Sequence, residues 1–247
     1  MTTILVTGSA AAIAMMALPF LPAPAAASWP FIAASAVLQV IYYSLVARTY
    51  ALADMSATYP LMRGTAPLLV ALATASFLAE PLAPMAWLGV AAICTGILST
   101  AIREHSGHGK GVALALLNAL VIASYTLVDG FGVRRSGAPA AYTLWIFLLT
   151  GIPLVGWALW RRRKAFLRRI ADGWLPGLGG GLATVASYGL ALWAMTLAPV
   201  AVIAALRETS ILFATAIAGF VLKERVGRAR VVGAVMIALG AALLRLA

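Results

Sequence analysis

The chain has 247 residues, of which 63% are hydrophobic and only 10% are charged, and its formal net charge is +11. Soluble domains carry about 25% charged residues, so this composition excludes a soluble globule with an ordinary polar surface. Apolar stretches of about 20 residues recur along the chain, each long enough to cross the hydrocarbon core as a helix and too long for barrel strands. We therefore predict an all-α, polytopic membrane protein.

In chain order the pattern predicts nine transmembrane helices, joined by short connectors rich in Pro, Gly and Arg. The first stretch also resembles a signal peptide, because small residues follow it from Ala23 to Ser28. No Lys or Arg precedes its apolar core, so we expect it to be retained as a span. The nine predicted spans are Thr3–Phe20, Pro30–Ala47, Ala57–Ala79, Ala83–Ile102, Gly111–Val133, Ala140–Trp160, Trp174–Met195, Pro199–Leu222 and Ala229–Leu244.

The chain contains an internal repeat, because Ala57–Leu98 aligns with Ala201–Ala242 without a gap. The third predicted span thereby matches the eighth, and the fourth matches the ninth. A shift of five spans is odd, so the two halves must cross the membrane in opposite senses, as in an inverted repeat. We assign the first half to residues 1–105 and the second to residues 106–247. The matched pairs include Arg63 and Arg207, Thr65 and Thr209, Glu80 and Glu224, Gly89 and Gly233, and Gly96 and Gly240.

Two halves of five helices each would make ten helices. The fifth predicted span opens the second half, and the first half contains no helix that matches it. Either the protein is a nine-span variant, or its start site is placed too late in the sequence. We favour the second explanation, because symmetric packing would leave a gap of one helix in the first half.

The basic residues are concentrated in a few connectors. Thirteen of the 18 Lys and Arg residues follow the second, fourth, sixth and eighth predicted spans, if Arg230 at the start of the ninth span is counted with the last of these connectors. Six of the thirteen lie between Arg161 and Arg169. This distribution is typical of topology signals rather than of nucleic-acid binding, and it predicts that these connectors are cytoplasmic and the C-terminus external.

Three charged residues lie well inside the third and eighth predicted spans, which makes them candidates for a binding site. Arg63, Arg207 and Glu208 would each cost roughly 2.5–3.5 kcal/mol near the bilayer centre, so they should face the protein interior or a water-filled cavity. Pro67 lies four residues after Arg63 and frees the Arg63 carbonyl from its helical hydrogen bond. We assign Pro67 a gating or structural role, and add Tyr59 and Thr65 to the candidate substrate-binding residues because they lie within two turns of Arg63.

The repeat diverges at this place, because Gly64 becomes Glu208 and Pro67 becomes Ile211. An asymmetric substrate in a pseudo-symmetric cavity would require such divergence. The alternative is that the arginines are interhelical braces that pair with Glu208 or Asp129, or that they extend to the membrane surface. Asp129 and Tyr125 complete the candidates. Asp129 would take a proton during transport, or instead cap its helix or pair with Arg134.

Glu80 and Glu224 follow the repeated helix in both halves, so we predict a gating or structural role for them. Cys94, the single cysteine, excludes an internal disulfide and is expected to pack in a span. No set of nucleophile, base and orienting acid stands out, and His105 and His108 make a poor metal site. We therefore expect no enzymatic activity, no metal site and no cofactor.

Several motifs resemble the drug/metabolite transporter superfamily, specifically its EamA branch. They are Tyr43-Ser44-Leu45, the run from Tyr59 to Pro67, Glu80-Pro81-Leu82, Trp87-Leu88-Gly89, Gly96-Ile97-Leu98, the run from Leu206 to Ala214, Lys223-Glu224-Arg225 and Gly233. The resemblance implies ten helices in two inverted halves around a central cavity with alternating access. It also implies that both chain ends are cytoplasmic, which differs from the charge-based topology.

The expected function is secondary transport in the cell membrane, with export of a small polar or anionic metabolite. Alternatives are a flippase for a lipid-linked small molecule, or a non-transporting membrane subunit. The expected partners are the lipid bilayer, the small-molecule substrate, and either a second copy of the chain or another membrane protein. No nucleic-acid partner is expected.

Overall fold

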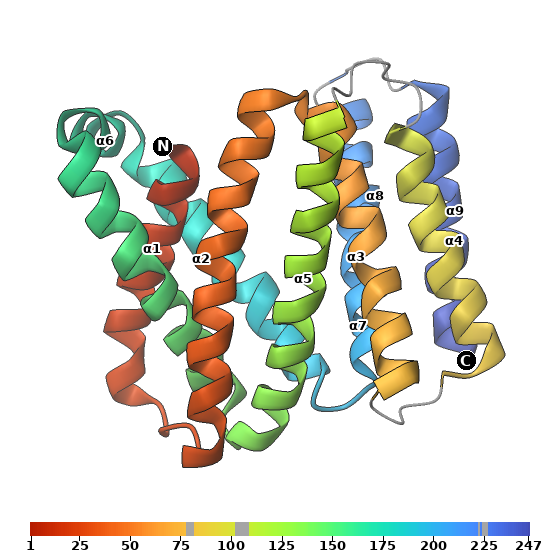
Figure 1. Ribbon diagram of the computed structural model, residues 1–247, viewed down its shortest axis with the longest axis horizontal. Helices are drawn as coiled ribbons and strands as arrows, with labels where there is room; N and C mark the ends of the chain where they lie inside the picture. Colours follow the sequence, from red (N-terminus) through yellow and green to blue (C-terminus); the bar gives the residue numbers. More distant parts are fainter. Residues whose placement is uncertain (78–81, 102–108, 222, 224–226) are drawn as a thin grey trace. The chain divides into compact units, whose positions relative to one another are not determined.

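The computed structural model describes residues 1–77, 82–101, 109–221, 223 and 227–247 (Figure 1). These residues are almost entirely helical, and no strand occurs among them. Six helical stretches in this part of the chain are long and apolar enough to cross a membrane: Thr2–Phe20, Ala26–Leu52, Gly109–Ser136, Pro139–Ala194, Val200–Val221 and Arg228–Leu246. Pro84–Thr100 is a shorter apolar helix. The protein is therefore a multi-pass helical membrane protein, as the composition predicted.

The chain divides into two compact units. Unit 1 contains Met1–Val40 and Val128–Leu197, and unit 2 contains Ile41–Leu127 and Ala198–Ala247. The division falls inside two long helices, α2 (Trp29–Leu52) and α5 (Gly109–Ser136), so each of these helices contributes to both units.

Unit 1 is built on α1 (Thr2–Ala17) and α6 (Pro139–Ala194), with the one-turn helices η1 (Leu18–Phe20) and η2 (Ala26–Ser28) after α1. The 56 residues of α6 would extend about 84 Å at 1.5 Å per residue, far more than the membrane core. Non-helical dihedral angles at Arg162 and Gly173 break α6 into three pieces, and the third piece runs back beside the first (Figure 1). Small residues bring the helices close together, since a Cβ on Gly181 would lie 2.9 Å from the Ala10 backbone nitrogen.

The middle piece of α6 corrects one expectation. The sequence predicted a connector between Trp160 and Trp174, whereas residues 163–172 are helical. These residues are mostly Arg, Lys, Leu and Ala, which favour helix, and Phe166 is buried on the inner side of the piece.

Unit 2 consists of α3 (Met55–Phe77), α4 (Pro84–Ala101), α9 (Arg228–Leu246) and the stretch Val200–Val221, together with parts of α2 and α5. Helix α3 continues through both Pro60 and Pro67. The stretch Val200–Val221 is less regular than the single span predicted from Pro199 to Leu222. It contains α7 (Val200–Leu206), the 3₁₀ segment η3 (Arg207–Thr209), α8 (Ser210–Ala216) and the π-helical segment η4 (Ile217–Val221).

Four glycines hold α4 against α9, which lie side by side in Figure 1. A Cβ on Gly240 would lie 2.7 Å from the Gly89 carbonyl oxygen, and one on Gly233 would lie 2.6 Å from that of Gly96. Real Cβ atoms do not come this close, so only glycine fits at these crossings. Because the earlier glycine of α4 meets the later glycine of α9, the two helices are antiparallel.

Candidate functional site

In unit 2 an ion pair joins α3 to its repeat partner, the stretch Val200–Val221. The Arg63 Nε lies 2.9 Å from Glu208 Oε2, and the two side chains are only 18% and 6% exposed. A charge inside a membrane helix is costly unless it is paired, and the Arg63–Glu208 pair partly offsets that cost for both residues. The structure therefore places these two candidate residues in direct contact.

The repeat explains why the acid stands on only one of the two helices. Gly64 is the position in α3 that aligns with Glu208, and a Cβ there would lie 2.9 Å from Leu98 Cγ and 3.3 Å from the Cys94 carbonyl. The contact with α4 therefore excludes a long side chain from this position of α3. Glu208 instead lies in the 3₁₀ segment η3, where the helical path between α7 and α8 is locally tightened.

Tyrosine rings and a second arginine surround the Arg63–Glu208 pair. Tyr42, Tyr59 and Tyr125 are close enough to interact electrostatically with the Arg63 guanidinium, and Arg207 interacts in the same way with Glu208. The rings of Tyr42 and Tyr125 pack edge to face, with centroids 5.8 Å apart. The pair thus has aromatic and hydroxyl-bearing neighbours from α2, α3 and α5.

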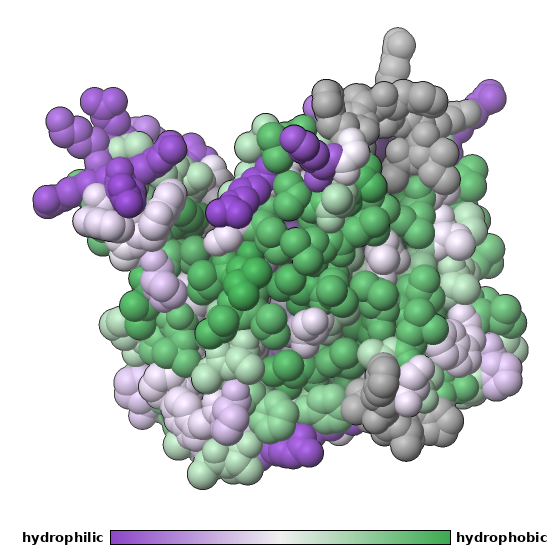
Figure 2. Space-filling view, viewed as in Figure 1, coloured by the Kyte–Doolittle hydropathy of each residue, from purple (hydrophilic) through white to green (hydrophobic). Residues whose placement is uncertain are grey.

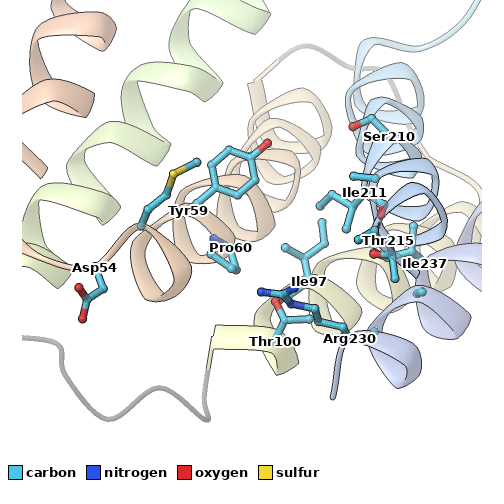
Figure 3. A pocket seen from close by; sticks show the side chains of 15 residues that line it. Asp54, Tyr59, Pro60, Ile97, Thr100, Ser210, Ile211, Thr215, Arg230 and Ile237 are labelled. Atoms are coloured by element: carbon cyan, nitrogen blue, oxygen red, sulfur yellow. Dashed lines mark hydrogen bonds between the residues drawn. The ribbon is translucent and has the colours of Figure 1, made fainter. Parts of the chain in front are cut away.

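A cavity of about 800 Å³ lies next to the pair within unit 2. Its walls come from α3 and the residue before it, from α4, α8, η4 and α9, and its side chains are shown in Figure 3. Tyr59 is one helical turn before Arg63, and Ser210 is two residues after Glu208, so the cavity begins beside the pair on both helices. The pair itself is not part of the wall. The polar or charged lining residues are Asp54, Tyr59, Thr100, Ser210, Thr215 and Arg230, and the rest of the lining is apolar.

Asp129 belongs to a separate polar cluster in unit 1. Its carboxylate is fully buried and accepts hydrogen bonds from the hydroxyl groups of Tyr142, at 3.2 Å, and Tyr188. These tyrosines stand on the first and third pieces of α6, so Asp129 connects both pieces to α5. The nearby Arg134 Nε donates to the Met195 carbonyl at 2.7 Å.

The predicted site residues therefore fall into four groups. Arg63, Arg207, Glu208, Tyr59 and Tyr125 come together in unit 2, whereas Asp129 lies in unit 1. Thr65 is half-buried and Pro67 is buried on α3, and neither lines the cavity. Glu80 and Glu224 lie outside the described residues.

Sequence reasoning missed most polar residues of the cavity wall. Asp54 lies in a predicted connector and Arg230 at the start of the ninth predicted span, so neither was a candidate, and Ser210 and Thr215 are uncharged residues. The one available signal was the position of Ser210, which directly follows Thr209, the residue that matches Thr65 in the repeat.

Comparison with known proteins agrees with the helical architecture. The sequence model described as the EamA-like transporter family matches residues 109–246. Fifteen chains of solved structures match. One of them, a crystal structure, has a TM-score of 0.75 and 17% identity, over 99% of this chain and 86% of its own, which shows a shared fold. No curated protein matched. The family match covers more than half of the chain, so the protein belongs to the EamA-like family of the drug/metabolite transporter superfamily of membrane transporters.

Proposed function

We propose that the protein is a secondary transporter of the cell membrane that exports a small polar or anionic metabolite by alternating access. The observation that carries the proposal is the 800 Å³ cavity beside the Arg63–Glu208 pair. Cavities of about 300–1,000 Å³ suit small molecules. The substrate would lie among Tyr59, Ser210 and Thr215, whose hydroxyl groups offer hydrogen bonds in a largely apolar cavity.

The charges around the cavity favour an anion over a cation. The count includes three arginines, Arg63, Arg207 and Arg230, and two acids, Asp54 and Glu208. The positive charges therefore exceed the negative charges by one. In a largely apolar cavity this excess would attract a carboxylate or phosphate more strongly than it would in bulk water. We assign Arg63, Arg207, Glu208, Tyr59 and Tyr125 to substrate binding, Tyr59 as part of the cavity wall and the other four beside it, with Thr65 and Pro67 in supporting positions.

The inverted repeat supplies the means of alternating access. We count nine spans, with two from α6 and one from Val200–Val221. We place the boundary between the two halves between residues 105 and 106. The family match begins at residue 109, close to that division. The glycine contacts support the symmetry: Gly89 aligns with Gly233 and Gly96 with Gly240, while Gly89 meets Gly240 and Gly96 meets Gly233. A half-turn that exchanges α4 with α9 would preserve both contacts.

Opening and closing would then require movement between α3 and its repeat partner. The Arg63–Glu208 pair links these two stretches, and the 3₁₀ segment η3 and π-helical segment η4 interrupt regular helix on one side of it. Such interruptions are frequent at hinges and functional sites. We assign Asp129 to a second polar site in unit 1, as a carboxylate that takes up a proton or stabilises the helices around it.

The direct test is a comparison of secreted metabolites. Host cells that express the wild-type chain, the Arg63→Gln variant or the control variant Arg245→Gln would be analysed by mass spectrometry, inside and outside the cell. We expect the wild type and the control to release at least one small anionic or polar metabolite, and Arg63→Gln to release little. A wild type that changes no external metabolite relative to the empty vector would contradict export.

A further inference from the structure

Unit 1 contains an apolar groove that is separate from the cavity described above. The unit 1 groove has a volume of about 310 Å³ and runs between α1 and all three pieces of α6. Its walls include Leu5 and Ser9 from α1, and Val155, Phe166, Trp174 and Leu178 from α6. The Ser9 hydroxyl and the Trp174 indole N–H are the polar groups among the lining side chains, so a polar occupant would lose most of its hydrogen bonds to water without replacement. The groove suits a hydrocarbon chain.

A dense group of cations borders one end of this groove. Arg161, Arg162, Arg163, Lys164, Arg168 and Arg169 are all exposed, and Asp172 is the acid among them. Phe166 and Ile170, which line the groove, stand on the same short piece of α6 as Lys164, Arg168 and Arg169. The Arg169 guanidinium donates to the Thr2 hydroxyl at 2.9 Å, which places this basic end beside the start of α1. Figure 2 shows hydrophilic side chains gathered where α6 turns back, next to apolar surface.

Tryptophans mark the level of the membrane at which the groove lies. Trp160 is 75% exposed and Trp174 is 58% exposed, and Trp157 is exposed one turn before Trp160. Exposed tryptophans of this kind are enriched at the boundary between hydrocarbon and head groups. The guanidinium of Arg161 stacks over the Trp160 ring at 4.3 Å from its centroid, which fixes a cation at the same level. Val155 is six residues before Arg161, about 9 Å further along the helix.

We propose that this groove and its basic border form a binding site for one anionic phospholipid. Part of one acyl chain occupies the groove between α1 and α6, and the phosphate lies among the cations of residues 161–169. The volume is too small for both chains, so the second chain stays in the bilayer. Cations at the end of a groove between helices provide the charge complementarity that anionic head groups require. The same positive charges would be present if they served only to orient the chain in the membrane, but that role does not require a groove beside them. This difference makes the proposal testable.

The test compares two lipids that differ only in head-group charge. The purified full-length chain, in a neutral detergent, would be titrated with phosphatidylglycerol or with phosphatidylcholine of identical chains, and retained lipid counted by native mass spectrometry. We expect one phosphatidylglycerol per chain, retained at least about tenfold more tightly than phosphatidylcholine. Glycerol 3-phosphate, which has the phosphate but no chain, should compete poorly. Equal retention of the two lipids, or full competition by glycerol 3-phosphate, would overturn the site.

Matched variants separate the groove from general surface charge. Leu178→Trp fills the groove, and its control Leu182→Trp adds the same ring one turn further along, outside the lining. Arg168→Gln combined with Arg169→Gln removes two cations at the border, and Lys223→Gln combined with Arg228→Gln removes two in unit 2. We expect each test variant to weaken phosphatidylglycerol binding about tenfold or more, and each control to leave it unchanged. Equal binding by a test variant and its control would refute the proposal. If Leu178→Trp does not fold, the charge variants and the comparison of the two lipids still test the proposal.

Discussion

At the residue scale, the central feature is a pair of charges that neither helix could accommodate alone. Removing one partner would leave the other buried without its counter-charge, whereas replacing both with neutral amides would leave two uncharged groups. The sequence alone left open whether Arg63 serves stability or transport, and this asymmetry separates the two roles.

We expect Arg63→Gln and Glu208→Gln each to lower the free energy of unfolding by roughly 3 kcal/mol and to reduce transport. The double variant should recover most of the stability, because no unpaired charge remains, but it should not recover transport. Thermal unfolding in detergent and a secretion assay on the same variants would check both parts. A double variant that regains transport together with stability would identify the pair as a structural brace only.

Asp129 gives a second prediction at this scale. Tyr142→Phe and Tyr188→Phe each remove one hydrogen-bond donor to a buried carboxylate, so each should destabilise the protein by about 1–3 kcal/mol. The Asp129→Asn variant, which keeps the shape and loses the charge, should be less sensitive to either tyrosine substitution. Thermal unfolding of the single and double variants measures this coupling. Additive effects in all combinations would mean that the carboxylate and the tyrosines act independently.

At the scale of the helices, close packing of α4 against α9 depends on glycine. We expect Gly240→Ala and Gly233→Ala each to cost about 1–3 kcal/mol, because the added methyl group would meet backbone oxygen and cannot be accommodated by rotating a side chain. Gly179 in α6 is the matched control, since a Cβ there meets nothing within 4 Å. Gly179→Ala should be neutral or slightly stabilising. Equal melting temperatures for the Gly240→Ala and Gly179→Ala variants would show that the close contact is unimportant.

The stretch Val200–Val221 should also differ from α9 in its dynamics. Its 3₁₀ and π-helical segments replace regular helical hydrogen bonds, so local opening there should cost less free energy than in an unbroken helix. We expect faster amide hydrogen exchange at residues 207–209 and 217–221 than in the middle of α9, measured by mass spectrometry in lipid nanodiscs. Uniform protection along both stretches would argue against a hinge.

At the scale of the whole molecule, the sequence predicts helices better than it predicts the contacts between them. The ninth predicted span, Ala229–Leu244, lies within two residues of α9 at both ends, because a long apolar run defines a span directly. The helical residues 163–172 were missed because their charges resembled a connector. The break at Arg207–Thr209 was missed because no Pro or Gly marks it.

Only part of the candidate site was predicted, because the sequence shows helices better than the contacts between them. Arg63 and Glu208 stood out because charges are rare in spans, and their pairing was one of the alternatives that the sequence allowed. Ser210, Thr215 and Thr100 could not be recognised as cavity residues. The spans are apolar on nearly every face, since lipid outside is as apolar as the protein interior, so the pattern does not show which face turns inward.

Accessibility of the cavity from both sides of the membrane tests the account most directly. Ser210→Cys would be introduced together with Cys94→Ala, which removes the single natural cysteine, and a membrane-impermeant maleimide would be added to one face of oriented vesicles at a time. We predict that the introduced thiol reacts from either face, and that adding Arg63→Gln restricts labelling to one face. Labelling from only one face in the protein with intact Arg63 would contradict alternating access through this cavity.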